Sequence, residues 1–196
     1  MPRKRFERPK PYLTRRKRFV IATEGKQTEK IYFELFKNDD FRKNVQVCVL
    51  PTREGESAPK HVLRRLRRHI HDEGVEEGDE LWVVVDVDSW GEEALQELCH
   101  ECNRSGFRVA VSNPCFELWL LLHQEHPSAP PTVKACKQDL TRLLGQYDKA
   151  SYNVGTLAPY IPHAINHARR LDSDPDAPWP RTTATRVYLL VEKLRA

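Results

Sequence analysis

The sequence predicts an α/β fold built on a parallel sheet, because short apolar strands alternate with amphipathic helices over its first two thirds. The clearest strand is the apolar run 81–85, which leads into Asp86 without polar alternation. Such a run is typical of a strand buried on both faces of a sheet. The chain has 196 residues, enough to bury one core of this kind without disulfide bonds. Its 39% hydrophobic and 31% charged residues indicate a soluble, globular protein.

Strands and helices are expected to alternate along residues 18–123. The strands are expected at 18–23, 45–50, 81–88 and 107–112. The helices are expected at 28–37, 61–71, 92–104 and 114–123. Apolar residues spaced three and four apart mark the helices, and Thr28 and Pro114 are suited to the starts of the first and the last. Right-handed crossovers between the strands would make the sheet parallel.

The last third of the chain is predicted to be helical, with proline-rich loops between the helices. These helices are expected at 133–144, 160–171 and 184–194. We therefore divide the chain into a basic flexible arm (1–17), an α/β core (18–123) and a helical extension packed on the core (124–196).

The N-terminal segment is strongly basic. Residues 1–18 contain nine Lys or Arg and one acid, a charge of +8, so the net charge of +4 leaves −4 for the rest of the chain. Such an arm typically binds nucleic acid, and a solubility tail is the alternative. The phosphate-binding candidates here are Arg15, Arg16, Lys17 and Arg18. A second set, with solvated charges as the alternative, lies on the basic face of helix 61–71 and comprises Arg64, Arg65, Arg67 and Arg68.

Apolar runs in the chain are too short to span a bilayer, and none follows the basic N-terminus as a signal sequence would. Membrane and secreted proteins are therefore excluded, and a cytoplasmic location is expected. The five cysteines are expected to be reduced thiols. Cys99 and Cys102 form a CxxC motif, but the second ligand pair of a structural zinc site is missing, so two small helix residues are the simpler interpretation.

Acidic side chains are expected at one edge of the sheet, where the carboxyl ends of parallel strands meet. Glu24 follows the first strand, and Asp86 and Asp88 end the third, on the same side of it by alternation. Close carboxylates repel one another and raise each other's pKa. Bound Mg²⁺ or Mn²⁺ would relieve this repulsion and serve phosphoryl chemistry. Turn formation or helix capping is the alternative for any one of these acids.

Three blocks of the sequence resemble the signature of the RloB-like family. They are Glu24-Gly25-x-x-Thr28-Glu29-x-x-Tyr32-Phe33, Asp86-x-Asp88, and residues 112–123, SNPCFELWLLLH. A closing block, Thr183-x-Thr185-x-Val187-Tyr188-x-Leu190-Val191, also fits. The resemblance implies a divergent Toprim-type core that binds Mg²⁺. It also implies a role in prokaryotic defence against phage, often beside an ABC/AAA-type ATPase.

The resemblance assigns roles residue by residue. Glu24 matches the Toprim glutamate, and Asp86 and Asp88 match the Asp-x-Asp pair, so all three are expected to bind metal and take part in catalysis. Many Toprim enzymes carry a further acid two residues after that pair, where this chain has Trp90. Glu117, the acid of the third block, is the expected replacement ligand.

Neighbouring polar residues receive secondary roles. Lys26, beside Glu24, is expected to neutralise a phosphate or the charge of the transition state, with an ordinary surface lysine as the alternative. Ser112 and Asn113, placed before a helix, are candidates for phosphate binding or for capping. Glu29 is interpreted as a first-turn acid that suits the helix dipole. His123 lies on the opposite helix face from Glu117 and is expected to be a core histidine.

The function expected from these residues is a metal-dependent nuclease that cleaves DNA or RNA as an effector of anti-phage defence. The alternative is a catalytically weak subunit that binds nucleic acid or docks on an ATPase, which the missing third acid favours. Topoisomerase chemistry is disfavoured because it needs a nucleophilic tyrosine, and Tyr32 and Tyr188 fall within predicted helices.

Overall fold

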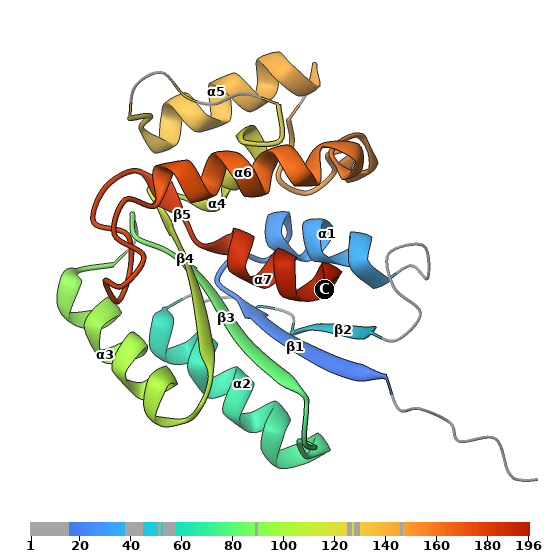
Figure 1. Ribbon diagram of the computed structural model, residues 1–196, viewed down its shortest axis with the longest axis vertical. Coiled ribbons are helices and arrows are strands. Elements are labelled where there is room, and N and C mark those ends of the chain that lie inside the picture. The colour runs from blue at the N-terminus through green and yellow to red at the C-terminus, as the bar shows by residue number, and fades with distance from the viewer. Residues whose placement is uncertain are drawn as a thin grey trace, which may run out of the picture.

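In the computed structural model, the described part of the chain contains five strands that form one sheet, in the order β2-β1-β3-β4-β5 (Figure 1). β1 (Lys17–Thr23), β2 (Val45–Leu50), β3 (Glu80–Asp86) and β4 (Arg108–Asn113) are parallel, and β5 (Ala184–Thr185) is antiparallel to β4. The structure describes residues 16–37, 45–50, 52, 58–88, 90–124, 127, 130–145 and 147–196. Within them the predicted α/β class is confirmed.

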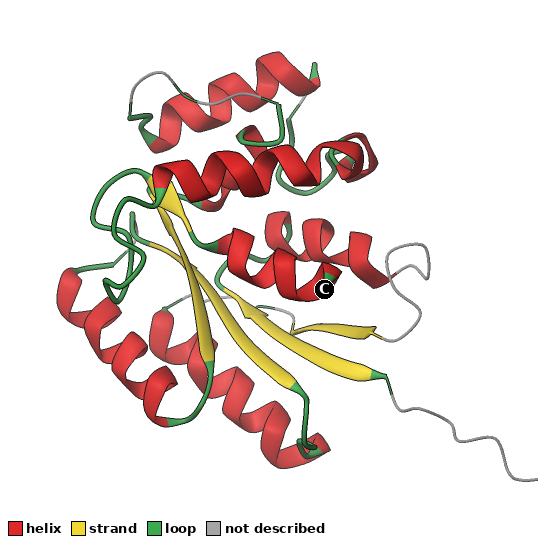
Figure 2. Cartoon of the chain, in the orientation of Figure 1, coloured by secondary structure: helices red, strands yellow, loops and turns green. Residues whose placement is uncertain are grey.

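Helices cover both faces of the sheet (Figure 2). α2 (Pro59–Glu73) and α3 (Glu92–Arg104) lie on one face. The other face carries α1 (Thr28–Glu34), which a 3₁₀ turn (Leu35–Lys37) extends, together with α4 (Phe116–Leu121), α6 (Ile161–Leu171) and α7 (Val187–Arg195). α5 (Val133–Leu144) packs on α4, and two 3₁₀ turns (Val154–Thr156 and Ala158–Tyr160) precede α6. No described helix has both the length and the apolar character needed to cross a bilayer.

The unbroken apolar run of β3 is explained by burial on both faces. Trp82 and Val84 belong to the core under α1 and α7, whereas Val83 and Val85 belong to the core under α2 and α3. All four side chains are buried. This alternation confirms the interpretation of 81–85 as a central strand.

The order of the strands creates a crevice. The chain leaves β1 for β2 on one side and then returns past β1 to β3 and β4 on the other. α1 therefore lies on one face, and α2 and α3 on the opposite face. In an open α/β sheet, such a reversal leaves a ligand-binding crevice beyond the carboxyl ends of the two strands that flank it, here β1 and β3.

Two predicted helix starts were wrong, and Thr28 does not cap the first helix. The last helix begins at Val187 instead of residue 184, because Ala184 and Thr185 pair with β4 as a fifth strand too short to show periodicity. α4 begins at Phe116, so Pro114 precedes it and does not open it. Gln27, not Thr28, occupies the position before α1.

A buried arginine fastens β5 and the loop before it to the sheet. The Arg186 guanidinium donates to both carboxylate oxygens of Asp172, at 3.0 and 3.3 Å, and to the carbonyls of Asp174 and Ala177. Tyr188 donates its hydroxyl to the same carboxylate at 3.2 Å. Both members of the ion pair are buried. Breaking such a pair leaves an uncompensated charge inside the protein.

We expect Arg186→Met to lower the free energy of unfolding by about 3–5 kcal/mol, because Asp172 would keep its buried charge without a partner. Arg181→Met is the matched control, since Arg181 pairs with Glu92 on the surface at 2.6 Å. Its cost should stay below about 1 kcal/mol. Urea unfolding of both variants measures the difference, and equal losses would show that the Arg186 pair does not anchor the extension.

Candidate functional site

A cavity of about 300 Å³ opens beyond the carboxyl ends of β1 and β3. Its described lining residues carry five carboxylates and three ammonium groups, an excess of two negative charges when each of these groups is ionised. The carboxylates belong to Glu24, Glu29, Asp86, Asp88 and Glu117, and the ammonium groups to Lys26, Lys137 and Lys149. The structure therefore brings together all four predicted metal ligands and the predicted catalytic lysine.

Backbone pairing fixes Glu24 against Asp86. The Glu24 N–H donates to the Val84 carbonyl at 2.9 Å, which extends the pairing of β1 with β3 by one residue. The Glu24 carboxylate in turn accepts the Asp86 N–H at 3.0 Å. The Glu24 side chain therefore reaches the backbone at the end of β3 because β1 and β3 are neighbours.

Asp86 carries a carboxylate oxygen, Oδ1, that is buried and has no hydrogen-bond partner within the described part of the chain. Burial raises the pKa of Asp86 well above its ordinary value, and the negative charges of Glu29 and Glu24 raise it further. A buried acceptor without a donor costs free energy. A cation at this oxygen would remove that cost. Asp88 lies beyond the end of β3 in a turn, exposed at the rim, so strand alternation does not apply to it.

Glu29 is a member of the site that the sequence did not reveal. It lies in the first turn of α1 and is 5% exposed, and its Oε1 accepts the Gly25 N–H at 2.9 Å. Burial, together with the charges of Glu117 and Glu24, raises the pKa of Glu29 to about 7. Gly25 permits this contact, because a Cβ there would lie 2.0 Å from the Glu29 carboxylate. The Glu-Gly-x-x-x-Glu spacing was the available signal.

Glu117 enters the cavity already paired. Its Oε1 accepts hydrogen bonds from Lys149 Nζ at 2.8 Å and from the Tyr147 hydroxyl at 3.2 Å. Burial acts to raise the pKa of Glu117, but the contact with Lys149 outweighs it and lowers the pKa. Glu117 is therefore ionised and bound to a cation of the protein. Lys149 and Lys137 come from the C-terminal extension, where no motif marked them.

The donor set fits a hard divalent cation. No group of three or more His, Cys, Asp or Glu is arranged as a ready-made metal site among the described residues. Among the described residues, the lining of the cavity nevertheless offers more carboxylates than lysines, and none donates a hydrogen bond to the buried Asp86 Oδ1. Oxygen ligands of this kind suit Mg²⁺ or Mn²⁺. Glu24 and Asp86 would hold the ion, with Asp88 next to them at the rim.

A family model described as RloB-like protein matches residues 19–194. The chain belongs to the RloB-like family. No curated protein and no solved structure matches it. The match covers the sheet, the cavity and the extension that contributes two of its lysines.

The structure of this RloB-like protein keeps Ser112 and Asn113 away from the cavity. Both belong to β4 and not to a helix N-terminus. Ser112 is fully buried, and its hydroxyl hydrogen-bonds with that of Thr185 at 2.9 Å. The Asn113 amide donates to the Pro180 carbonyl at 3.1 Å. Both side chains serve the junction between β4 and the extension, so their assignment to phosphate binding is corrected.

The four basic residues predicted to bind phosphate near the arm differ in their positions in the structure. Arg15 lies outside the described residues, and Arg16 is exposed just before β1. Lys17 and Arg18 belong to β1, and they pair with Glu80 at 2.8 Å and with Asp79 at 2.9 Å. These pairs lie at the amino ends of the strands, at the opposite edge of the sheet from the cavity. Lys17 therefore belongs to β1 and not to the arm.

The basic face of α2 holds fewer residues than expected. Arg64 and Arg68 are exposed, as predicted. Arg65 instead points inward, where its guanidinium donates to the Thr23 carbonyl at 2.5 Å and to the Thr52 hydroxyl at 3.0 Å. It therefore supports the end of β1, directly before Glu24.

His123 is confirmed as a core histidine. It is fully buried, its Nδ1 donates to the Trp119 carbonyl at 3.0 Å, and its Nε2 accepts the Tyr32 hydroxyl at 3.1 Å. Burial lowers the pKa of His123 to about 4, so the ring is neutral at physiological pH.

We expect Glu29→Gln to stabilise the metal-free protein at pH 8 by about 2 kcal/mol relative to its effect at pH 5. The pKa of Glu29 is raised from 4.5 to about 7 in the folded state. Its stabilising contribution is therefore complete below about pH 4.5 and is lost as the pH rises to about 7. Urea unfolding in EDTA at both pH values measures this, with the exposed Glu77→Gln as control. A difference independent of pH would contradict the assignment.

Proposed function

We propose that this RloB-like protein is a metal-dependent nuclease that hydrolyses phosphodiester bonds in DNA or RNA. The observation that carries the proposal is the carboxylate cavity at the β1–β3 crevice, where Asp86 Oδ1 is buried and no described residue donates a hydrogen bond to it. Metal-assisted hydrolysis of a phosphodiester requires oxygen ligands for the ion and positive charge for the phosphate. The lining of the cavity offers both carboxylate oxygens and lysine side chains.

In this proposal, some residues of the cavity hold the metal ion and another binds the phosphate of the substrate. A bound Mg²⁺ or Mn²⁺ would supply an activated water and neutralise phosphate oxygens. Glu24 and Asp86 would hold the ion, and the Asp86 N–H orients the Glu24 carboxylate before any ligand arrives. Lys26, exposed in the loop after β1, would contact the phosphate of the substrate.

Nucleic acid would reach the cavity over the exposed arginines of α2. Arg64 and Arg68 point to solvent on the helix that carries Arg65, and Arg65 binds the backbone just before Glu24. The basic residues 1–16 would add sequence-independent attraction that weakens with salt. We further propose, from the family resemblance, that the protein is an effector of anti-phage defence and that its partner is an ABC/AAA-type ATPase.

We expect the full chain to cleave plasmid, single-stranded DNA or total tRNA in Mg²⁺ or Mn²⁺ and not in EDTA. Asp86→Asn and Glu24→Gln should each lower the rate by about a hundredfold or more, because each removes an anionic metal ligand. Exposed Glu73→Gln is the control with the same change in charge. Calorimetric titration with Mn²⁺ should show weaker binding in the two ligand variants. Cleavage that persists in EDTA, or in both variants, would contradict the proposal.

A binding subunit without strong catalysis is the second candidate. The Lys149 contact favours it, because Glu117 already has a cation of the protein as its partner. Such a subunit would retain nucleic acid in a filter-binding assay and yet show no turnover with any metal. Cleavage that appears only after the ATPase is added would return the assignment to a nuclease.

A further inference from the structure

The edge of the sheet at β4 is open over half its length. β5 pairs only with Ser112 and Asn113, and the Arg186 N–H donates to the Val111 carbonyl at 2.9 Å. Because the backbone groups of a strand point alternately to its two sides, the Val109 N–H and C=O and the Val111 N–H also face outward. No backbone partner meets them within the described residues. An open edge of this kind is a template for another strand.

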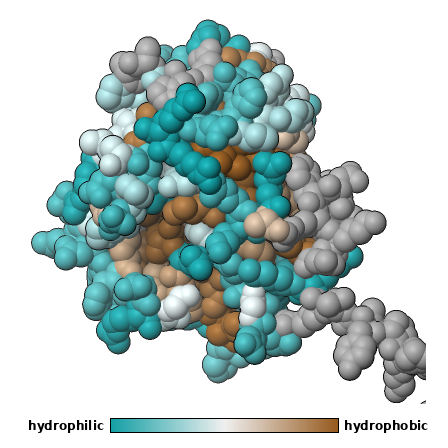
Figure 3. All heavy atoms as spheres, in the orientation of Figure 1, coloured by the Kyte–Doolittle hydropathy of each residue, from teal (hydrophilic) through white to brown (hydrophobic). Residues whose placement is uncertain are grey.

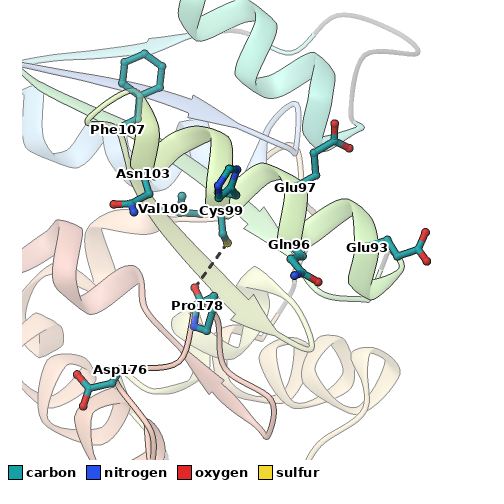
Figure 4. Close-up of a pocket in the computed structure, with 10 residues that line it drawn as sticks. Glu93, Gln96, Glu97, Cys99, Asn103, Phe107, Val109, Asp176 and Pro178 are labelled. Atoms are coloured by element: carbon teal, nitrogen blue, oxygen red, sulfur yellow. Dashed lines mark hydrogen bonds between the residues drawn. The ribbon is translucent and has the colours of Figure 1, made fainter.

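Two cavities flank this edge, one on each face of the sheet. A cavity of about 820 Å³ lies between the edge, α3 and the loop that carries Asp176 and Pro178 (Figure 4). A second cavity, of about 390 Å³, lies on the α7 side and is lined by Trp82, Arg108 and Leu189. Val109 lines both. Where β4 runs in Figure 1, Figure 3 shows an apolar hollow in the surface.

The two cavities suit the two sides of one added strand. Successive side chains of a strand point to opposite faces of its sheet. A segment paired with Val109 would therefore place alternate side chains in the larger and the smaller cavity. A helix or a small globular surface could not use both cavities and the free backbone groups at once.

The chemistry of the cavities specifies those side chains. The larger cavity is lined by the acids Glu93, Glu97 and Asp176, with no Lys or Arg among its described lining residues. Its lining also includes the apolar Phe107 and Val109. A long basic side chain fits both features, since its stem covers apolar surface and its charge meets the acids. On the other side, Leu189 is 37% exposed and offers an apolar contact.

We propose that the β4 edge is a docking site for an extended segment of a partner protein in which Lys or Arg alternates with apolar residues. The segment adds to the sheet beyond β4 and is held by backbone hydrogen bonds, as in other cases of strand addition. Its basic side chains enter the cavity beside α3, and its apolar side chains contact Leu189 and Trp82. The site is separate from the carboxylate cavity, so it stands whether or not the protein is a nuclease.

The test uses the full chain labelled with ¹⁵N and a capped synthetic peptide of alternating Val and Lys. We expect saturable shifts of the Val109 and Val111 amide signals. The exposed pair Glu93→Gln/Asp176→Asn should weaken binding about fivefold or more, because it removes two charges from the larger cavity. The control pair Glu73→Gln/Glu77→Gln makes the same change in charge elsewhere and should leave the affinity unchanged.

Two further peptides, N-methylated on alternate amides, separate strand addition from simple charge attraction. Methylation of the amides that face β4 should weaken binding about tenfold or more, whereas methylation of the other set should not. Equal binding of both isomers would overturn the proposal, as would equal binding of a peptide with Glu in place of Lys, or shifts that spare Val109 and Val111. A wild-type dimer in sedimentation that Leu189→Glu abolishes would assign the edge to a second copy and overturn it as well.

Discussion

The parallel pairing of β1 with β3 is the constraint on which the site depends. It continues past the strand through the hydrogen bond from Glu24 to Val84, and the Glu24 carboxylate then meets the Asp86 N–H. Two acids 62 positions apart are therefore brought together by backbone geometry, although their charges repel. The two apolar layers that sandwich the sheet supply the stability that offsets this repulsion.

The cavity is divided between two parts of the chain with opposite charge. Among the described lining residues, the α/β core contributes all the carboxylates and Lys26, and the extension contributes Lys137 and Lys149. The contacts of Tyr147 and Lys149 with Glu117, and of the Tyr152 hydroxyl with the Thr28 carbonyl at 2.8 Å, fasten the extension beside the acids. The extension is thus part of the wall of the site as well as a cover for the sheet.

The sequence was informative where one physical signal had one meaning. An apolar run without alternation required a central strand, and acids that follow such strands had to gather at one edge. Glu29 was not recognised as a member of the site because an acid in the first turn of a helix looks the same in sequence whether it is exposed or buried. Ser112 was misassigned because its burial depends on β5. That strand has only two residues, too few to show a periodic pattern in the sequence. Lys149 follows α5 in a loop, where position depends on tertiary contacts alone.

Arg65 gives α2 a mechanical connection to the crevice. Its guanidinium donates hydrogen bonds to the Thr23 carbonyl and the Thr52 hydroxyl, whereas Arg64 and Arg68 are exposed on the same helix. Any displacement of α2 relative to β1 would have to stretch or break this contact, which lies one residue before Glu24.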